Sequence, residues 1–110
     1  KAFDVRLTVV GERCFPVAVH ARTEQARVDW RSGYDDLTYR RCDLPADVQA
    51  RALAYLRTFG LTFGAFDFSV DAAGRFWFLE CNPAAEWGWL VDETDVPIAD
   101  AIADELLAVA

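Results

Sequence analysis

The sequence has no methionine, one histidine and three cysteines, and none of the cysteines forms a CxxC pair. His20 is a weak zinc-ligand or general-base candidate, because no cysteine or second histidine lies near it in the sequence. The sparse, odd set of Cys14, Cys42 and Cys81 is typical of reduced thiols and favours a cytoplasmic protein. The missing methionine, with a strand pattern directly after Lys1, predicts a piece of a longer protein. A mature chain without its initiator methionine is the alternative.

Long apolar runs and the common catalytic motifs are also missing. No run approaches the roughly 18 residues of a membrane helix, and no basic, apolar N-terminal segment indicates a signal peptide. GxxxxGK[ST], GxGxxG and GxSxG motifs are absent. The net charge of −7 argues against nucleic-acid binding through phosphate neutralisation, although it allows a nucleotide bound through Mg²⁺. A chain of 110 residues, 54% of them apolar, is long enough for one domain with a core.

The N-terminal third predicts a β-hairpin. Residues 3–10 alternate with period two, so that Asp4, Arg6 and Thr8 share one face and the apolar side chains share the other. Gly11-Glu12 fits a two-residue turn, and residues 14–21 return as the partner strand. Residues 22–41 are polar and irregular, with room for one more short strand.

Two helices and a second hairpin complete the predicted order. A helix is expected to begin at residues 43–45 and to stop at Gly60. Pro97 starts a final helix whose apolar stripe is Ile98, Ile102, Leu106 and Val109. The order strand, strand, loop, helix, strand, strand, loop, helix predicts an α+β fold, an antiparallel sheet with helices packed on one face.

Residues 63–70 and 75–82 predict the second hairpin, and its register decides where three polar side chains lie. Alternation places Phe76, Phe78, Glu80 and Asn82 on one face of their strand. A four-residue loop over residues 71–74 would pair Asp67 with Phe78. In this register Asp67, Glu80 and Asn82 converge on one side of the sheet.

Two carboxylates among aromatic side chains are costly to bury without compensation. Mg²⁺ prefers hard oxygen ligands and usually takes one or two carboxylates with substrate phosphates, so Asp67, Glu80 and Asn82 could hold it against a triphosphate. A polar strand end with a solvated Glu80 is the alternative. Arg6, on the face of Asp4, could bind a phosphate bidentately. The alternative for Arg6 is a surface ion pair worth ~0–1 kcal/mol.

Five segments occur in the order and with the gaps of a known family: residues 4–6 (Asp-Val-Arg), 9–11, 60–61, 64–68 and 80–83 (Glu-Cys-Asn-Pro). Together they resemble the C-terminal part of an ATP-grasp ligase. The resemblance is closest to the branch that matures ribosomally made peptides, the microviridin-type graspetide ligases. Residues 29–31 (Asp-Trp-Arg) and 87–89 (Trp-Gly-Trp) favour this branch.

The resemblance implies that residues 1–110 are the C-terminal ATP-grasp subdomain of a longer protein whose N-terminal and phosphate-loop parts are absent. It implies an ATP- and Mg²⁺-dependent ligase. An acyl phosphate forms on a carboxylate, and an amine or hydroxyl of a ribosomally made precursor peptide then attacks it. The fragment alone is expected to be inactive. The alternative is a non-catalytic binding or assembly domain that kept the fold.

The same resemblance assigns roles to individual residues. Asp67, Glu80 and Asn82 match the Mg²⁺ ligands, and Asn82 also matches a nucleotide-binding position. Arg6 matches the catalytic arginine that stabilises the phosphoryl group or the acyl phosphate, and Lys1 matches a lysine of the nucleotide site.

Two further expectations concern assembly and one departure from the family pattern. A homodimer is expected, through an exposed apolar patch or through pairing of the first strand, with neither nucleic acid nor a membrane as partner. Asp95 stands where relatives often have glycine.

Overall fold

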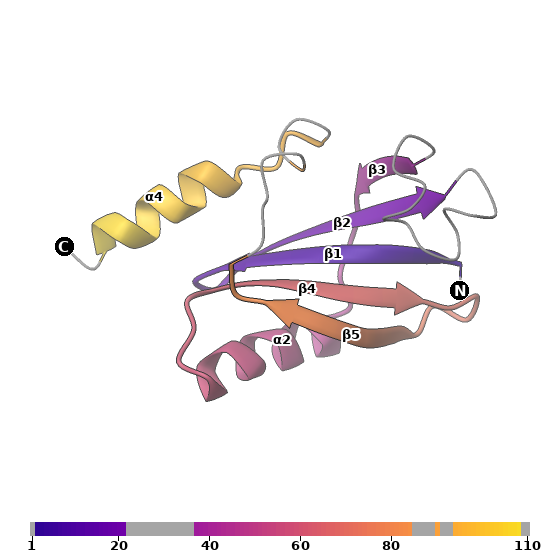
Figure 1. Cartoon of the computed structure of the whole chain (residues 1–110), viewed down its shortest axis with the longest axis horizontal. Helices are drawn as coiled ribbons and strands as arrows, with labels where there is room; N and C mark the ends of the chain where they lie inside the picture. Colours follow the sequence, from indigo (N-terminus) through magenta and orange to yellow (C-terminus); the bar gives the residue numbers. More distant parts are fainter. Residues whose placement is uncertain (1, 22–36, 85–89, 91–93, 109–110) are drawn as a thin grey trace.

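The computed structural model describes residues 2–21, 37–84, 90 and 94–108. Its five strands are β1 (Phe3–Val10), β2 (Arg13–Ala21), β3 (Leu37–Arg41), β4 (Phe63–Val70) and β5 (Phe76–Asn82), and its two long helices are α2 (Ala46–Thr58) and α4 (Ile98–Ala108). The strands form one sheet in the order β3-β2-β1-β4-β5, with every neighbouring pair antiparallel (Figure 1). The predicted α+β class is confirmed. No helix in the described ranges is long and apolar enough to cross a membrane.

β1 is the central strand because β2 and β4 pair with its two edges. The sequence predicted the β1–β2 hairpin and its turn at Gly11, where φ is +62°. It did not predict the β1–β4 pairing. Pairing of the first strand with a second copy of the chain is therefore ruled out, because both edges of β1 are already hydrogen-bonded.

The main core lies between the sheet and α2. Val5, Leu7 and Val9 of β1 are at most 1% exposed and pack with Leu56 of α2. Alternation along β1 sends these side chains to one face of the sheet, and α2 lies against that face in Figure 1. Gly60 follows the helix with φ +65°, so the predicted stop is confirmed.

α4 packs elsewhere. Its Ile98 and Ala101 form a second apolar cluster with Val10 and Val17. The side chains of these two valines lie on the face of the sheet opposite to the main core. The expectation of helices on one face thus describes α2, whereas α4 extends from one end of the sheet (Figure 1). The predicted apolar stripe of α4 shortens after Ile102. Leu106 is 65% exposed, and Val109 lies outside the described residues.

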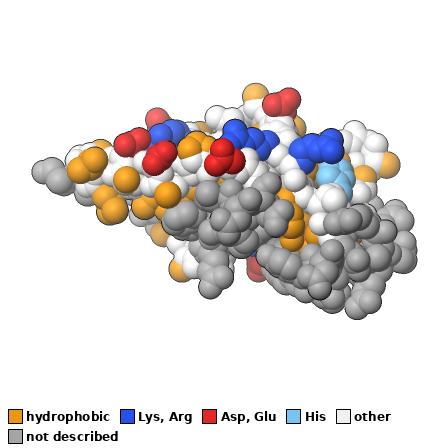
Figure 2. Space-filling model, turned by 90° about the horizontal axis from the view of Figure 1, so that it is seen from above, with side chains coloured by type: hydrophobic (Ala, Val, Ile, Leu, Met, Phe, Trp, Pro, Cys, Tyr) orange, Lys and Arg blue, Asp and Glu red, His pale blue; other side chains and the backbone are white. Residues whose placement is uncertain are grey.

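Arg13 ties α4 to the first hairpin. Its guanidinium donates to the Ala101 carbonyl oxygen at 3.1 Å and to the Asp104 carboxylate at 3.0 Å. A Cβ atom at Gly11 would overlap the Glu105 carboxylate, so the turn also packs closely under the helix. Acidic and basic side chains are intermixed along this side of the molecule in Figure 2.

The β4–β5 hairpin differs from the predicted register. Val70 pairs with Phe76, so five residues rather than four separate the strands. An odd loop alone would place Asp67 and Glu80 on opposite faces, but a β-bulge opposite the Asp67–Phe68 step leaves Leu79 as an extra residue. Asp67 therefore pairs directly with Glu80. The predicted register was wrong, and the predicted convergence on one face is confirmed.

The bulge also corrects the expected face of β5. Phe78 pairs with Phe68 and Phe76 with Val70, and these side chains belong to the face that α2 covers. Glu80 and Asn82 point to the opposite face. The expectation that Phe76, Phe78, Glu80 and Asn82 share one face is therefore wrong.

Asp71 organises the hairpin loop. Its carboxylate accepts hydrogen bonds from the backbone N–H groups of Ala73 and Arg75, from the Arg75 side chain and from the Trp77 indole, at 2.9–3.1 Å. These donors, the Arg75 backbone N–H first among them, lower the pKa of Asp71 to about 2. The loop is thus held by one ionised side chain.

Candidate functional site

A row of side chains crosses the sheet on the face away from α2. The register places Arg6 of β1 opposite Asp67 of β4, and Asp67 opposite Glu80 of β5. On the other side Arg6 faces Val17 of β2, which faces Arg41 of β3. Directly paired residues share a face, so one guanidinium and two carboxylates become neighbours.

Arg6 and Asp67 form a buried, bidentate ion pair. The Arg6 Nε donates to Asp67 Oδ1 at 2.6 Å, and Nη2 donates to Oδ2 at 3.2 Å. The two side chains are only 10% and 7% exposed. The alternative of a surface ion pair for Arg6 is therefore excluded. Breaking a buried pair from one side typically costs 3–5 kcal/mol, because it leaves one charge without compensation.

The Asp67 carboxyl also lies next to the Glu80 carboxyl, and both of its neighbours affect its pKa. Burial raises its pKa first of all, the hydrogen bond and charge of Arg6 lower it, and the hydrogen bond and charge of Glu80 raise it again. The Asp67 carboxylate thus lies between the Arg6 guanidinium and a second carboxylate. Two neighbouring carboxylates are hard oxygen donors of the kind that Mg²⁺ takes, so the donor set fits Mg²⁺.

Asn82 lies one step further along β5, at the end of the strand. It pairs with Ala65, two residues from Asp67, and therefore lies on the face of Asp67 and Glu80. Its Oδ1 accepts the Ala84 N–H at 2.9 Å, which fixes the amide and leaves the second lone pair of that oxygen available.

Asn82 could supply a third oxygen ligand beside the two carboxylates. In the ranges that the structure describes, no group of three or more His, Cys, Asp or Glu side chains could hold a metal. A magnesium site here would combine the two carboxylates and the Asn82 amide with phosphate and water oxygens.

The other polar side chains of β1 flank this row. Asp4 is 5% exposed and Thr8 is fully buried, and both share the face of Arg6. The Thr8 hydroxyl has no hydrogen-bond partner among residues 2–21, 37–84, 90 and 94–108. Lys1, the predicted lysine of the nucleotide site, lies outside the described residues, as do residues 29–31 and 87–89.

The sequence reasoning missed the contact between Arg6 and Asp67, although it named both residues. Arg6 is the only basic residue of its strand and Asp67 is the only charged residue of its strand, and that complementarity was a usable signal. It also missed Arg41, whose guanidinium donates to the Thr94 carbonyl oxygen at 2.7 Å and to the Asp95 carbonyl oxygen. Asp95 has φ +57°, a left-handed conformation that glycine, the residue expected at this position from the resemblance, adopts without strain.

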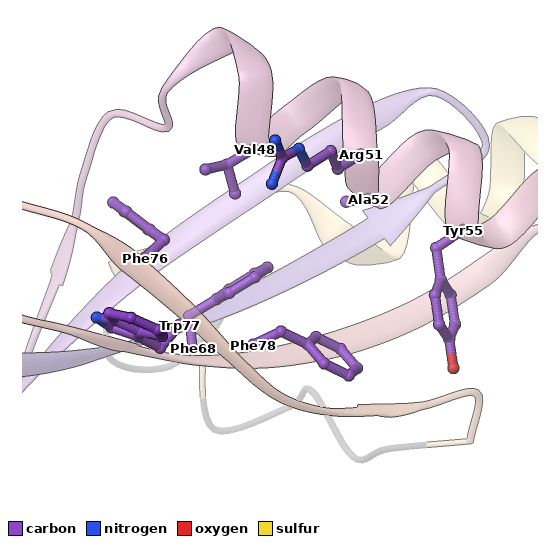
Figure 3. A pocket seen from close by; sticks show the side chains of 8 residues that line it. All are labelled: Val48, Arg51, Ala52, Tyr55, Phe68, Phe76, Trp77 and Phe78. Atoms are coloured by element: carbon purple, nitrogen blue, oxygen red, sulfur yellow. The ribbon is translucent and has the colours of Figure 1, made fainter.

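A groove opens on the opposite face, between α2 and β5. It encloses about 490 Å³. Its lining includes Arg51 of α2 and five aromatic side chains, which are Tyr55, Phe68, Phe76, Trp77 and Phe78 (Figure 3). Within the described ranges the Arg51 guanidinium makes no hydrogen bond or ion pair. The groove is separate from the charged row, because the sheet lies between them.

Comparisons with known proteins point to one group of enzymes. No family profile matches the sequence, and no curated protein matches it. Among solved structures, the macrocyclase MdnC of Microcystis aeruginosa, bound with its precursor peptide MdnA, superimposes with a TM-score of 0.83 at 36% identity. An ATP-grasp ligase of Chryseobacterium gregarium that is associated with a ribosomally made, modified peptide superimposes with a TM-score of 0.88 at 30% identity. That ligase is in complex with ADP and with a leader and core peptide.

Both matches cover 100% of this chain but 34% of the solved protein, so the chain spans about a third of their length. A third structure, the ATP-grasp ligase PsnB with precursor, Mg and ADP, has a TM-score of 0.80 at 19% identity and supports the fold alone.

Proposed function

The chain belongs to the ATP-grasp ligases associated with ribosomally made peptides, and from this we propose that residues 1–110 are the C-terminal subdomain that provides the metal-binding side of a ligase site. The observation that supports the proposal most directly is the row of Arg6, Asp67 and Glu80, in which the ion pair of Arg6 with Asp67 is buried. Because the chain spans about a third of its relatives, the activity belongs to a longer protein and the adenine-binding residues come from the rest of it.

In the proposed reaction Asp67, Glu80 and Asn82 would hold Mg²⁺, whose charge would neutralise part of the charge on the nucleotide phosphates. The γ-phosphoryl group of ATP passes to a carboxylate of a precursor peptide, and ADP leaves. A hydroxyl or amine of the same peptide then attacks the acyl carbon, phosphate departs, and an ester or amide remains. Arg6 stabilises the transferring phosphoryl group, since a guanidinium matches two phosphate oxygens.

The isolated chain provides only one side of this site. We expect it to bind Mg·ATP weakly or not at all, and isothermal calorimetry on residues 1–110 measures this directly. Micromolar affinity would show that the nucleotide needs no residues beyond this chain.

The activity is tested in the longer ligase with ATP and a candidate precursor peptide that contains both carboxylates and hydroxyls or amines. Mass spectrometry should show the loss of one water per bond formed, with one ADP released for each. Asp67→Asn and Glu80→Gln should abolish both signals, whereas Asp104→Asn, the same change on exposed α4, should not. Full turnover by both site variants would favour the alternative of a non-catalytic binding or assembly domain.

We further propose a cytoplasmic homodimer. Trp77, Phe78 and Leu79 are each more than half exposed on β5, the last strand of the sheet, and an apolar edge of this kind favours association. Light scattering at high concentration tests the dimer, and a clean monomer would contradict it.

A further inference from the structure

Arg6 lies where it competes with the proposed metal for Asp67. Both oxygens of Asp67 are engaged by the guanidinium, at 2.6 and 3.2 Å, in a site where the two side chains are about 90% shielded from water. A cation bound to Asp67 at roughly 2.1 Å would therefore lie only a few ångströms from a fixed positive charge. The two cations repel each other while they share this carboxylate.

From this geometry we infer that Arg6 is the counter-cation of the metal-free site and releases Asp67 when the metal binds. The inference rests on the proposed function, because it takes Asp67 and Glu80 as the metal ligands. It gives Arg6 two successive partners. In the metal-free protein it compensates the charge of Asp67, and after metal binding the freed guanidinium is available to the phosphoryl group.

The arrangement of the row explains why one side chain can do both. Arg6 lies on the central strand and Asp67 on its neighbour, so the ion pair forms inside the sheet face rather than at its rim. Glu80, on the last strand, is exposed and lies beyond Asp67 as seen from Arg6. A metal approaching from the side of Glu80 meets its carboxylate first and Asp67 second, while the guanidinium is on the far side.

The direction in which one substitution at Arg6 changes the metal affinity shows whether Arg6 competes with the metal or only positions Asp67. Mn²⁺ binding to the nucleotide-free chain is measured by electron paramagnetic resonance, with Mn²⁺ as the probe for the divalent site. Arg6→Gln removes the charge but keeps an amide donor near Asp67, and it should bind Mn²⁺ roughly tenfold more tightly or better. Arg6→Lys keeps the charge and should stay near the affinity of the unsubstituted chain. If Arg6 only positions Asp67, Arg6→Gln should instead bind Mn²⁺ more weakly.

Two controls separate this inference from the proposed function. Asp67→Asn should abolish the Mn²⁺ signal, and Asp104→Asn should not. If Asp67→Asn leaves Mn²⁺ binding intact, the metal is elsewhere and the proposed function fails together with the inference. If Asp67→Asn abolishes binding but Arg6→Gln does not strengthen it, only the inference is overturned.

A measurement on the unsubstituted chain covers the case in which Arg6→Gln does not fold. The Arg6 Nε–H, assigned by its loss in Arg6→Lys, should give a nitrogen–proton NMR signal protected by its hydrogen bond to Asp67. Saturating Mg²⁺ should shift this signal and speed its exchange with water. A signal that stays unchanged, while signals of Asp67 and Glu80 respond to Mg²⁺, would overturn the release of Asp67.

Discussion

Replacing Glu80 by glutamine should stabilise the metal-free chain while it removes a proposed metal ligand. Glu80 and Asp67 are directly paired across β4 and β5, and the charge of Glu80 is one cause of the raised pKa of Asp67. Like charges in such a pair destabilise a sheet by roughly 0.2–1 kcal/mol, and exposure of Glu80 favours the lower half of that range. For a domain of this size, Glu80→Gln should raise Tm by roughly 1–4 °C at neutral pH.

The pH dependence fixes the sign of this effect. Because the folded-state pKa of Asp67 is raised, its contribution to stability is present below its unfolded pKa and is lost as pH rises through the folded value. Glu80→Gln removes one cause of the raised pKa of Asp67. The substitution should therefore stabilise the chain at pH values where both carboxyls are ionised, and this gain in stability should vanish in acid, where they are protonated. Melting curves by circular dichroism from acid to neutral pH, with and without Mg²⁺, measure this. Mg²⁺ should raise the Tm of the unsubstituted chain more than that of Glu80→Gln. A lower Tm for Glu80→Gln at neutral pH without metal would refute the reasoning.

Three further outcomes follow from other contacts. In the longer ligase, Arg6→Ala should lower turnover by ~10²–10³ with a smaller change in ATP affinity, and Arg6→Lys should restore little of the lost turnover. Steady-state kinetics measure both variants. Near-normal turnover of Arg6→Ala would show that Arg6 does not stabilise the phosphoryl group. Leu56→Ala should cost about 2–5 kcal/mol in urea unfolding, because Leu56 is 2% exposed in the main core, whereas exposed Leu107→Ala should cost little. Asp71 has a lowered pKa, so its stabilising contribution is present above about 3.8 and is lost as pH falls through about 2. Acid unfolding of Asp71→Asn should therefore show a smaller loss over that window, and an unchanged acid transition would count against the loop contacts.

Much of the fold could be predicted from local pattern. The hairpin of residues 3–21 and the stop at Gly60 follow from alternation and turn chemistry. The convergence of Asp67 with Glu80 was expected from the chemistry of two carboxylates, although the register from which it was derived was wrong. These signals are local, since each depends on residues that are near one another in the sequence. The family resemblance was likewise readable, because each of its segments is a short run of consecutive residues.

The remainder depends on contacts distant in sequence. Nothing local in residues 3–10 indicates that β1 pairs with β4, more than fifty residues away, and this pairing creates the contact between Arg6 and Asp67. The position of α4 depends on Val10 and Val17, which a helical stripe does not specify. The bulge at Leu79 was missed for a different reason: an apolar residue among apolar neighbours leaves no trace in the alternation.

That bulge has a consequence for how the second hairpin tolerates insertions and deletions. Directly paired residues share a face whatever the length of the loop between them, so a residue added to or removed from the loop of residues 71–75 can leave every strand pairing unchanged. Leu79 is the residue of β5 that has no partner on β4, so its removal would close the bulge and keep Asp67 opposite Glu80. A residue inserted or removed elsewhere in β5 would instead exchange the faces of the side chains on one side of the change. Natural variants of this hairpin should therefore differ in length in the loop or at Leu79, and not at the other positions of β5.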